Sequence, residues 1–261
     1  MSPIHDLAPQ LANARAFWLG YGAESRLEGD LTTYRSGLGS PSLNGVLRWT
    51  GSDFDDAHAR AALEFAGVPW WWWVGPDSRA DTADRLRAWG GKLAARQPIM
   101  AMDLDHANLP EPTAALTIVE VTDPATLREW VSTIAPVFGV PSRSIEARTA
   151  LEFGREGDIT RFAGTIDGRI VATASLFDAH GIAGVYTVAT AEGFRRRGFG
   201  AAMTAAVMRA GRERGLKVAT LQSSSAGEPV YLRMGFQQVA EYRIFTPPDA
   251  DAKACRGSHR Q

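Results

Sequence analysis

The stretch that decides the fold reads Val188-Ala189-Thr190-Ala191-Glu192-Gly193-Phe194-Arg195-Arg196-Arg197-Gly198-Phe199-Gly200-Ala201, in a chain of 261 residues. The residues that lead into it, Ile182–Thr190, are rich in β-branched and small side chains, which predicts a strand. The residues that follow, Phe199–Arg214, place Met203, Val207 and Ala210 at helical spacing on one face. A strand therefore leads into a loop with paired glycines, and the loop leads into a helix.

The chemistry of this loop suits a diphosphate. Gly198 and Gly200 allow the backbone to approach a ligand and to adopt angles that a β-carbon hinders. Backbone N–H groups at a helix start form an anion site, and Arg195–Arg197 add positive charge beside it. Two other phosphate loops do not fit. The Gly-Lys-Ser/Thr of a Walker loop is missing, and Met203 stands where a dinucleotide fingerprint has its third glycine.

Outward from the loop, the C-terminal half shows regular elements. We expect strands at Leu116–Val121, Ile159–Thr165, Ile170–Phe177, Ile182–Thr190, Val218–Gln222 and Gln238–Phe245, and helices at Leu127–Val137, Ser144–Phe153, Phe199–Arg214 and Pro229–Met234. Tight turns at Asp167-Gly168 and His180-Gly181 join the central strands. The order β-α-α-β-β-β-α-β-α-β predicts a mixed sheet with helices on its faces.

The N-terminal half has a weaker pattern. We expect helices at Ala14–Tyr21, Asp53–Ala66 and Thr82–Trp89, and strands at Leu43–Trp49, Trp70–Val74 and Pro98–Leu104. Residues 70–104 repeat the strand–loop–helix–strand order of residues 182–222, which is compatible with an internal duplication. The matching loop, Gly75–Asp81, lacks paired glycines and carries two acids. We therefore expect it not to bind a diphosphate.

The composition of the chain limits the cellular location and the binding partners that we expect. Lys plus Arg total 28 and Asp plus Glu total 29, so the net charge of −1 provides no general attraction for nucleic acid or anionic lipid. The single cysteine, Cys255, forms no intramolecular disulfide, and no Cys/His cluster has metal-ligand spacing. No signal peptide or membrane-length apolar run is evident. We expect a cytoplasmic protein, monomeric or homodimeric, without metal, nucleic acid or membrane.

Two motifs at matching distance resemble a known family. Arg-x-x-Gly-x-Gly at Arg195–Gly200, after a strand that ends in Val188-Ala189-Thr190, is similar to the acetyl-CoA loop of the GNAT superfamily of N-acetyltransferases. Tyr231–Phe236 carries the Tyr-x-x-x-Gly-Phe pattern that follows this loop in the family. The resemblance is clear over residues 185–236, and the order of elements extends it to 114–245. It implies an α/β (α+β) fold whose mixed, mostly antiparallel sheet is flanked by helices.

The resemblance also suggests a division of the chain. Pro110 and Pro112 predict a linker, with a boundary near residue 113. Residues 1–112 would be a degenerate GNAT-like domain, and residues 113–248 the catalytic domain. The polar residues 249–261 predict a disordered tail.

As a GNAT enzyme, the protein would move an acetyl group from acetyl-CoA to a primary amine by direct attack in a ternary complex. The backbone N–H of Val188 matches the family's donor to the oxyanion, and Tyr231 matches its general acid. A tyrosine pKa of about 10 exceeds a thiol pKa of about 8.5, so Tyr231 would assist the leaving thiolate more than drive its protonation. The cofactor-binding residues that the resemblance implies are Val188, Ala189, Thr190, Arg195, Arg196, Arg197, Gly198, Phe199, Gly200, Ala201 and Tyr231. Ser224 and Ser225, just past a predicted strand, are weaker members of this set.

The sequence leaves the acceptor, the general base and two alternative functions open. The acceptor is a small-molecule or protein amine. Glu146, Glu152 and Asp178 lie on segments that border the acceptor cleft in the family, but we expect each to be a solvated surface charge, and Glu192 to cap the loop. A non-catalytic acyl-CoA sensor would keep the loop and need no proton donor. A nucleic-acid-binding module would use the arginine triplet instead, which the neutral charge balance disfavours.

Overall fold

The computed structural model describes residues 3–22, 29–110, 115–155 and 159–248, so the expected tail from residue 249, with Cys255, lies outside the described residues. Two compact units make up the chain: unit 1 has residues 1–17 and 98–240, and unit 2 has residues 18–97 and 241–261. Their division falls inside α1 (Leu7–Leu19), β4 (Lys92–Asp103) and β10 (Gln237–Thr246). The compact units therefore do not follow the expected boundary near residue 113. The expected division into a degenerate and a catalytic domain concerns ancestry and activity, not compactness, and it stays a prediction.

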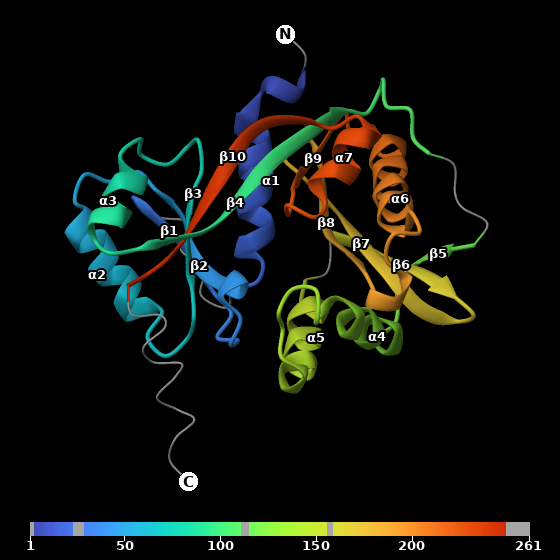
Figure 1. The fold of residues 1–261 in the computed structure, drawn as a ribbon, viewed down its shortest axis with the longest axis horizontal. Coiled ribbons are helices and arrows are strands. Elements are labelled where there is room, and N and C mark those ends of the chain that lie inside the picture. The colour runs from blue at the N-terminus through green and yellow to red at the C-terminus, as the bar shows by residue number, and fades with distance from the viewer. Residues whose placement is uncertain (1–2, 23–28, 111–114, 156–158, 249–261) are drawn as a thin grey trace. The chain divides into compact units, whose positions relative to one another are not determined.

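Unit 1 contains a mixed sheet with the strand order β4-β9-β8-β7-β6-β5 (Figure 1). In this sheet β8 and β9 are parallel, and the other neighbouring strands are antiparallel. This confirms the predicted element order and the mostly antiparallel sheet. The elements of unit 1 that lie wholly within it are β5 (Thr117–Glu120), α4 (Pro124–Ile134), α5 (Ile145–Phe153), β6 (Ile159–Ile166), β7 (Arg169–Ala179), β8 (Ile182–Thr190), α6 (Phe199–Glu213), β9 (Val218–Gln222) and α7 (Glu228–Met234).

Two tight turns shape the β6–β7–β8 meander. Asp167 and Gly168 have φ of 50° and 77°, and His180 and Gly181 have φ of 57° and 72°. Two successive left-handed residues are typical of the hairpin turns whose twist matches that of the strands. The strand residues directly before and after each turn pair with each other. This confirms the turns predicted from the sequence.

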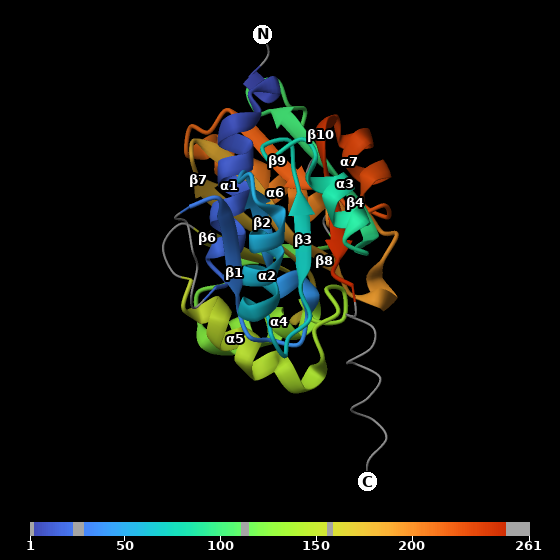
Figure 2. The same ribbon diagram turned by 90° about the vertical axis from the view of Figure 1, so that its left-hand side faces the viewer.

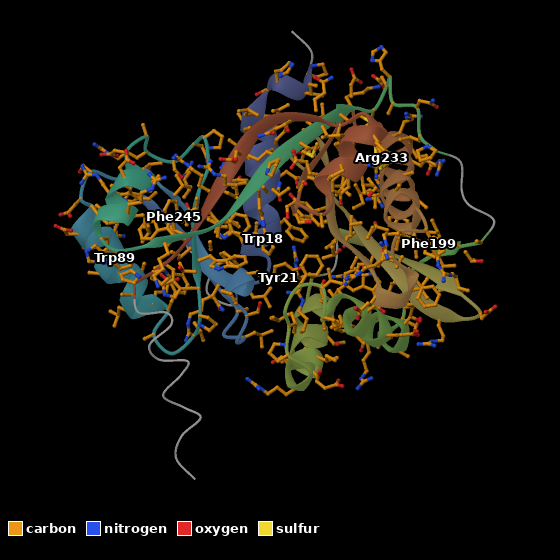
Figure 3. The ribbon with its side chains drawn as sticks, viewed as in Figure 1. Trp18, Tyr21, Trp89, Phe199, Arg233 and Phe245 are labelled. Atoms are coloured by element: carbon orange, nitrogen blue, oxygen red, sulfur yellow. The ribbon has the colours of Figure 1, made fainter. Side chains whose placement is uncertain are left out.

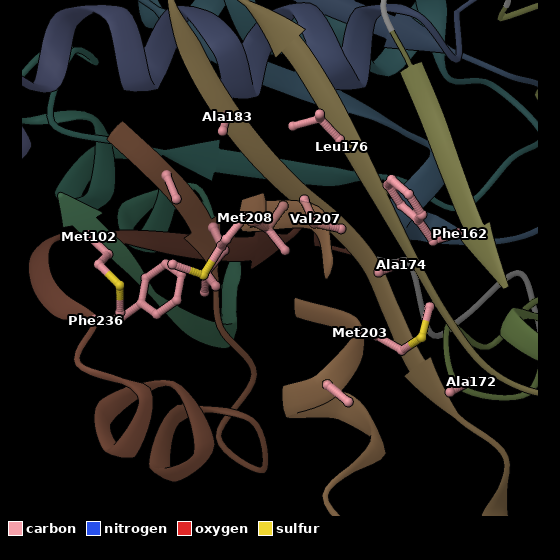
Figure 4. Packing of buried hydrophobic residues seen from close by; sticks show 14 of the residues in the cluster. Met102, Phe162, Ala172, Ala174, Leu176, Ala183, Met203, Val207, Met208 and Phe236 are labelled. Carbon is pink, nitrogen blue, oxygen red and sulfur yellow. The ribbon is translucent and has the colours of Figure 1, made fainter. Parts of the chain in front are cut away.

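The core of unit 1 lies between α6 and the sheet, as Figure 4 shows. Met203 and Val207 are fully buried, as their helical spacing predicts. Small side chains on the sheet allow the helix to approach closely. A β-carbon added at Gly211 of α6 would lie only 2.8 Å from the β-carbon of Ala183 on β8. This close packing places the last turn of α6 beside the start of β8.

Unit 2 contains β1 (Leu31–Arg35), β2 (Asn44–Trp49) and β3 (Trp71–Val74), and the end of β10 pairs with β3. The helices α2 (Phe54–Glu64) and α3 (Thr82–Ala88) cover one face of this sheet (Figure 2). Trp49 and Trp72 are buried in the core between them. Much of the tryptophan-rich run thus serves packing. The sequence pattern did not indicate β1, and it placed the start of α1 too late, at Ala14.

Candidate active site

A cavity of about 1100 Å³ lies where β8 and β9 separate in unit 1. The parallel register of the two strands ends at the pair Gly184 and Thr220, while β8 continues to Thr190. The cavity is lined by the end of β8, by the loop before α6 and the first turn of that helix, and by α7 with the segment before it. Figure 3 labels two of the lining side chains, Phe199 at the start of α6 and Arg233 on α7.

The two sequence motifs meet at this cavity. All of the predicted cofactor-binding residues except Arg197 line it, namely Val188, Ala189, Thr190, Arg195, Arg196, Gly198, Phe199, Gly200, Ala201, Ser224 and Tyr231. The guanidinium of Arg197 instead lies 5.3 Å from the centre of the Phe194 ring. Ser225 is exposed and does not line the cavity.

The loop before α6 has the backbone of an anion site. Gly198 is the N-terminal cap of α6 and has a φ of 80°, and Arg196 also lies in the left-handed region, at 61°. The first backbone bond of the helix runs from the N–H of Ala202 to the carbonyl of Gly198 at 3.0 Å. The N–H groups just before Ala202 have no such partner by helix geometry. These donors stand at the positive end of the helix dipole, and their residues line the cavity.

Gly200 makes room for a ligand. In the structure, a β-carbon at this position would meet only Oγ1 of Thr190, at 3.8 Å. The protein's own packing therefore does not require a glycine here. A group bound against the backbone of the first turn would require it.

A β-bulge interrupts β8 at the cavity. Thr173 pairs with Ala189 and Ser175 pairs with Tyr186, so two residues of β8 lie opposite one residue of β7. These two residues of β8 are Thr187 and Val188. Thr187 has a φ of 51°, an unfavourable angle for a β-branched residue that costs on the order of 1–3 kcal/mol. The bulge takes Val188 out of the ladder register, and Val188 lines the cavity.

Tyr231 projects from α7, which Gly235 ends with a φ of 97°. Its ring and that of Phe236 form an edge-to-face pair, with centroids 5.8 Å apart and planes at 68°. Burial raises the pKa of Tyr231 to about 12, although a hydrogen bond with Thr204 opposes the shift. The Tyr231 hydroxyl therefore stays protonated at neutral pH and is a hydrogen-bond donor.

Two of the carboxylates considered as bases have other partners, and a third is exposed. Glu146 is 69% exposed and pairs with Arg128 at 2.6 Å. Asp178 lies 3.8 Å from Arg214. Glu192 is exposed in a short turn, where its carbonyl accepts the N–H of Arg195. These carboxylates are not among the residues that line the cavity.

Glu152 corrects one expectation, because it is fully buried and not a solvated surface charge. Its carboxylate lies 2.6 Å from Arg148 and 2.8 Å from Arg161. Burial alone would raise the pKa of Glu152, but these arginines, with Arg155, outweigh it and lower the pKa to about 2. The group is therefore an anion at neutral pH, in a buried ion cluster. Like the other three carboxylates, it does not line the cavity.

The predicted linker forms part of the cavity wall, which the sequence did not indicate. Asn108 and Pro110 line the cavity. Arg212 of α6 donates to the carbonyls of Leu104 at 2.8 Å and Ala107 at 2.7 Å, and Arg209 donates to that of Pro110. Two prolines correctly predict irregular backbone, but the arginines that hold it come from a distant helix.

The corresponding loop of unit 2 differs in charge. Asp81 stands directly before α3 and lies 2.7 Å from both Arg79 and Arg85. Hydrogen bonds from Arg85 and Arg79 lower the pKa of Asp81, which keeps it ionised. An acidic residue paired with two arginines thus stands directly before this helix, where α6 has Gly198. In the described part of the chain, no group of His, Cys, Asp and Glu could hold a metal ion, and no helix could cross a bilayer.

Comparisons with known proteins agree on one fold. Residues 125–236 match the model of the acetyltransferase (GNAT) family. A GCN5-related N-acetyltransferase from Kribbella flavida is 19% identical with a TM-score of 0.73, covering 94% of this chain and 98% of its own. A GCN5-related N-acetyltransferase from Sphaerobacter thermophilus is 19% identical with a TM-score of 0.57, and the match covers 73% of this chain and 63% of that protein. A tandem GNAT protein from the clavulanic acid biosynthesis pathway is 14% identical with a TM-score of 0.58, covering 83% and 77%. No curated protein matches the chain.

Proposed function

The chain carries a domain of the GNAT acetyltransferase family over residues 125–236, and from this premise we propose that it transfers an acetyl group from acetyl-CoA to a primary amine. Direct attack in a ternary complex is the mechanism that we propose. The observation that carries the proposal is the convergence of the loop at Arg195–Ala201, the open end of β8 and Tyr231 on one cavity.

The residues of the cavity fit coenzyme A. The amides at the start of α6 and the guanidinium groups of Arg195 and Arg196 suit a diphosphate. Beyond Gly184, β8 has an edge that β9 does not cover, and an extended amide-bearing arm can hydrogen-bond to such an edge. A volume of about 1100 Å³ exceeds that of most small-molecule sites, as a long cofactor requires.

The catalytic roles follow from the chemistry of the lining groups. When bound, acetyl-CoA supplies the thioester that the amine attacks. We assign the backbone N–H of Val188 as the donor to the carbonyl oxygen, because the bulge takes Val188 out of the ladder. We assign the Tyr231 hydroxyl as the donor to the departing sulfur. With a pKa of about 12 it forms a hydrogen bond to the thiolate more readily than it gives up its proton.

The amine enters as the neutral base in our proposal. None of the four carboxylates considered lines the cavity, and Glu152 in particular is locked in its ion cluster. The acceptor's own protonation equilibrium then supplies the reactive form. kcat/KM should rise with pH up to the pKa of the acceptor amine and change its midpoint when the acceptor is changed.

We propose that residues 1–112 and 113–248 are a degenerate and a catalytic copy of one domain. Asp81 and its two arginines occupy the helix start where the second copy would hold the diphosphate. Only one cofactor molecule should therefore bind each chain. Calorimetric titration with acetyl-CoA should give a stoichiometry of about one.

The direct test combines an acceptor screen that follows release of free CoA thiol with two glycine variants. Gly198 and Gly215 flank α6, and both have φ near 80°, at 80° and 81°. Gly198→Ala should weaken CoA binding by about five- to tenfold and lower turnover at limiting acetyl-CoA, because it strains the loop that holds the diphosphate by about 1 kcal/mol. Gly215→Ala imposes the same strain at the far end of the helix, in open space, so it should lower stability by about 1 kcal/mol and leave the Kd unchanged. Absence of CoA binding by the intact protein would overturn the proposal.

A further inference from the structure

The β-bulge in β8 is held by two buried hydroxyl groups of β7. We infer that Ser175 and Thr173 are positioning residues, which lock Thr187 in its left-handed conformation and so aim the N–H of Val188 at the thioester carbonyl. The inference rests on the proposed function of the cavity. It adds a reason for the position of that N–H, which the family's loop motif does not contain.

The conformation of Thr187 needs such a lock. A bulge with its first residue in the left-handed region normally has glycine there. Thr187 has a φ of 51° and is β-branched, so its own side chain opposes this backbone angle. Left alone, the residue would return to the extended region, and Val188 would rejoin the ladder with β7.

Both polar ends of Thr187 are bound to β7. Oγ1 of Thr173 donates to the carbonyl oxygen of Thr187 at 2.9 Å. The hydroxyl of Ser175 forms a short hydrogen bond with the hydroxyl of Thr187. One contact fixes the peptide plane that leads into Val188, and the other fixes the side chain.

The two hydroxyls have no access to solvent. Thr173 and Ser175 are both fully buried. The other buried residues of β7 are all apolar, namely Ile170, Val171, Ala172, Ala174, Leu176 and Phe177. A buried hydroxyl needs a partner, and for both of these the partner is Thr187. The arrangement is therefore specific to the bulge.

For catalysis, the lock determines the direction in which the N–H of Val188 points. An oxyanion donor works only if it is held at hydrogen-bond distance from the place where negative charge develops. The peptide N–H of Val188 belongs to the same plane as the carbonyl of Thr187. The bond from Thr173 to that carbonyl therefore sets the direction of the donor.

The test uses three variants of the lock and one control. Ser175→Ala removes one partner. Thr187→Val keeps the branched shape and removes the hydroxyl. In the double variant Ser175→Ala/Thr187→Gly, the glycine adopts a φ of 51° without help. Thr220→Val is the control, because Thr220 is also a fully buried strand residue, and its hydroxyl bonds to Gln10 at 3.0 Å and not to the bulge.

The readout is the ¹³C resonance of acetyl-CoA labelled at its carbonyl carbon, measured when bound to each protein, together with kcat and KM. Hydrogen bonding polarises the carbonyl and moves the resonance downfield. Wild type, the Thr220→Val control and the double variant should show the downfield shift. Ser175→Ala and Thr187→Val should lose it, with kcat about tenfold lower and KM for acetyl-CoA within about twofold of wild type.

The outcomes separate this inference from the proposed function. If acetyl-CoA binds but Ser175→Ala and Thr187→Val keep the wild-type shift, the lock is refuted and the proposed function stands. If the double variant is as impaired as Ser175→Ala, the hydroxyl does not act through the backbone of Thr187, and the inference also falls. If acetyl-CoA does not bind at all, both proposals fail.

Discussion

The ring of Phe17 stacks on the ring of Tyr186, with centroids 3.6 Å apart and planes within 6° of parallel. The hydroxyl of Tyr186 donates to Oδ1 of Asn13 at 2.8 Å, and burial raises the pKa of this tyrosine. The amide of Asn13 in turn donates to three carbonyls of the β7–β8 hairpin, those of Phe177, Ala179 and Ile182. The first part of α1 is therefore tied to the strand that carries the bulge.

Asn13→Ala should destabilise unit 1. Asn13 is fully buried, and its loss leaves three carbonyls and the Tyr186 hydroxyl without this partner. Unsatisfied buried groups of this kind cost about 2–3 kcal/mol in total when neighbours or water recover part of the loss. Urea unfolding should show the decrease. Ala8→Ser, at an exposed position of α1, should change the free energy of unfolding by less than about 0.5 kcal/mol. Equal unfolding midpoints for Asn13→Ala and wild type would show that the Asn13 contacts do not stabilise unit 1.

The elements with strong local signals were predictable from the sequence. The strand Val218–Gln222 and the two hairpin turns agree with the structure, because apolar runs and left-handed turn residues are properties of neighbouring residues. The start of α1 was not predictable, since it includes Pro9 and the buried polar residues Gln10 and Asn13. Asn13 bonds to the carbonyl of Ala179, and Gln10 bonds to the hydroxyl of Thr220, and both of these partners lie far away in the sequence.

The site shows the same limit. The loop and Tyr231 could be found because each carries a compact motif. The hydroxyls of Thr173 and Ser175 could not, because their role depends on a shift in register between two strands. The burial of Glu152 was also hidden. Its arginine partners lie four residues before it and nine residues after it, on a helix and a strand, and only the fold makes them converge.

The arginine triplet should divide into two functional groups. Arg195 and Arg196 line the cavity, whereas Arg197 lies over the ring of Phe194. Arg195→Gln and Arg196→Gln should each weaken CoA binding by about tenfold, as loss of a charged contact to phosphate does. Both variants should also flatten the dependence of Kd on salt, measured by calorimetry from low to high ionic strength.

Arg197→Gln is the matched control for these variants, because it makes the same change of charge one residue away. It should leave Kd within about twofold and lower stability slightly through the lost contact with Phe194. Three equal losses of affinity would indicate a diffuse electrostatic effect. That result would contradict the division drawn from the cavity.

Glu152 should be essential for stability at neutral pH. Glu152→Gln leaves Arg148 and Arg161 without their buried anion, which should cost about 3–5 kcal/mol. The matched variant Glu146→Gln removes an exposed pair and should cost less than about 1 kcal/mol. Urea unfolding at pH 7 compares the two. The folded fraction of Glu152→Gln should keep the wild-type kcat, because Glu152 does not line the cavity. A much lower kcat in that folded fraction would instead indicate that Glu152 acts as a base.

The stability contributed by Glu152 should also depend on pH in a defined direction. Its pKa is lowered from 4.5 to about 2 in the folded protein, so the unfolded chain takes up the proton first as pH falls. The contribution is complete above pH 4.5 and is lost as pH falls toward 2. Wild type should lose stability relative to Glu152→Gln over this range. A constant difference between the two proteins from pH 6 to pH 3 would contradict the low pKa.

Tyr231 should act as a hydrogen-bond donor that does not ionise during catalysis. Because burial raises its pKa to about 12, the hydroxyl keeps its proton through the working range. kcat should therefore show no decrease attributable to this group between pH 7 and pH 10. Tyr231→Phe should lower kcat by about 10²-fold and leave the Kd for CoA within about twofold, since it removes a contact made mainly to the leaving sulfur. A sensor without catalysis would show no turnover to lose. A basic limb near pH 9 that is present in wild type and absent in Tyr231→Phe would mean that the hydroxyl titrates freely, and the buried-donor role would have to be given up.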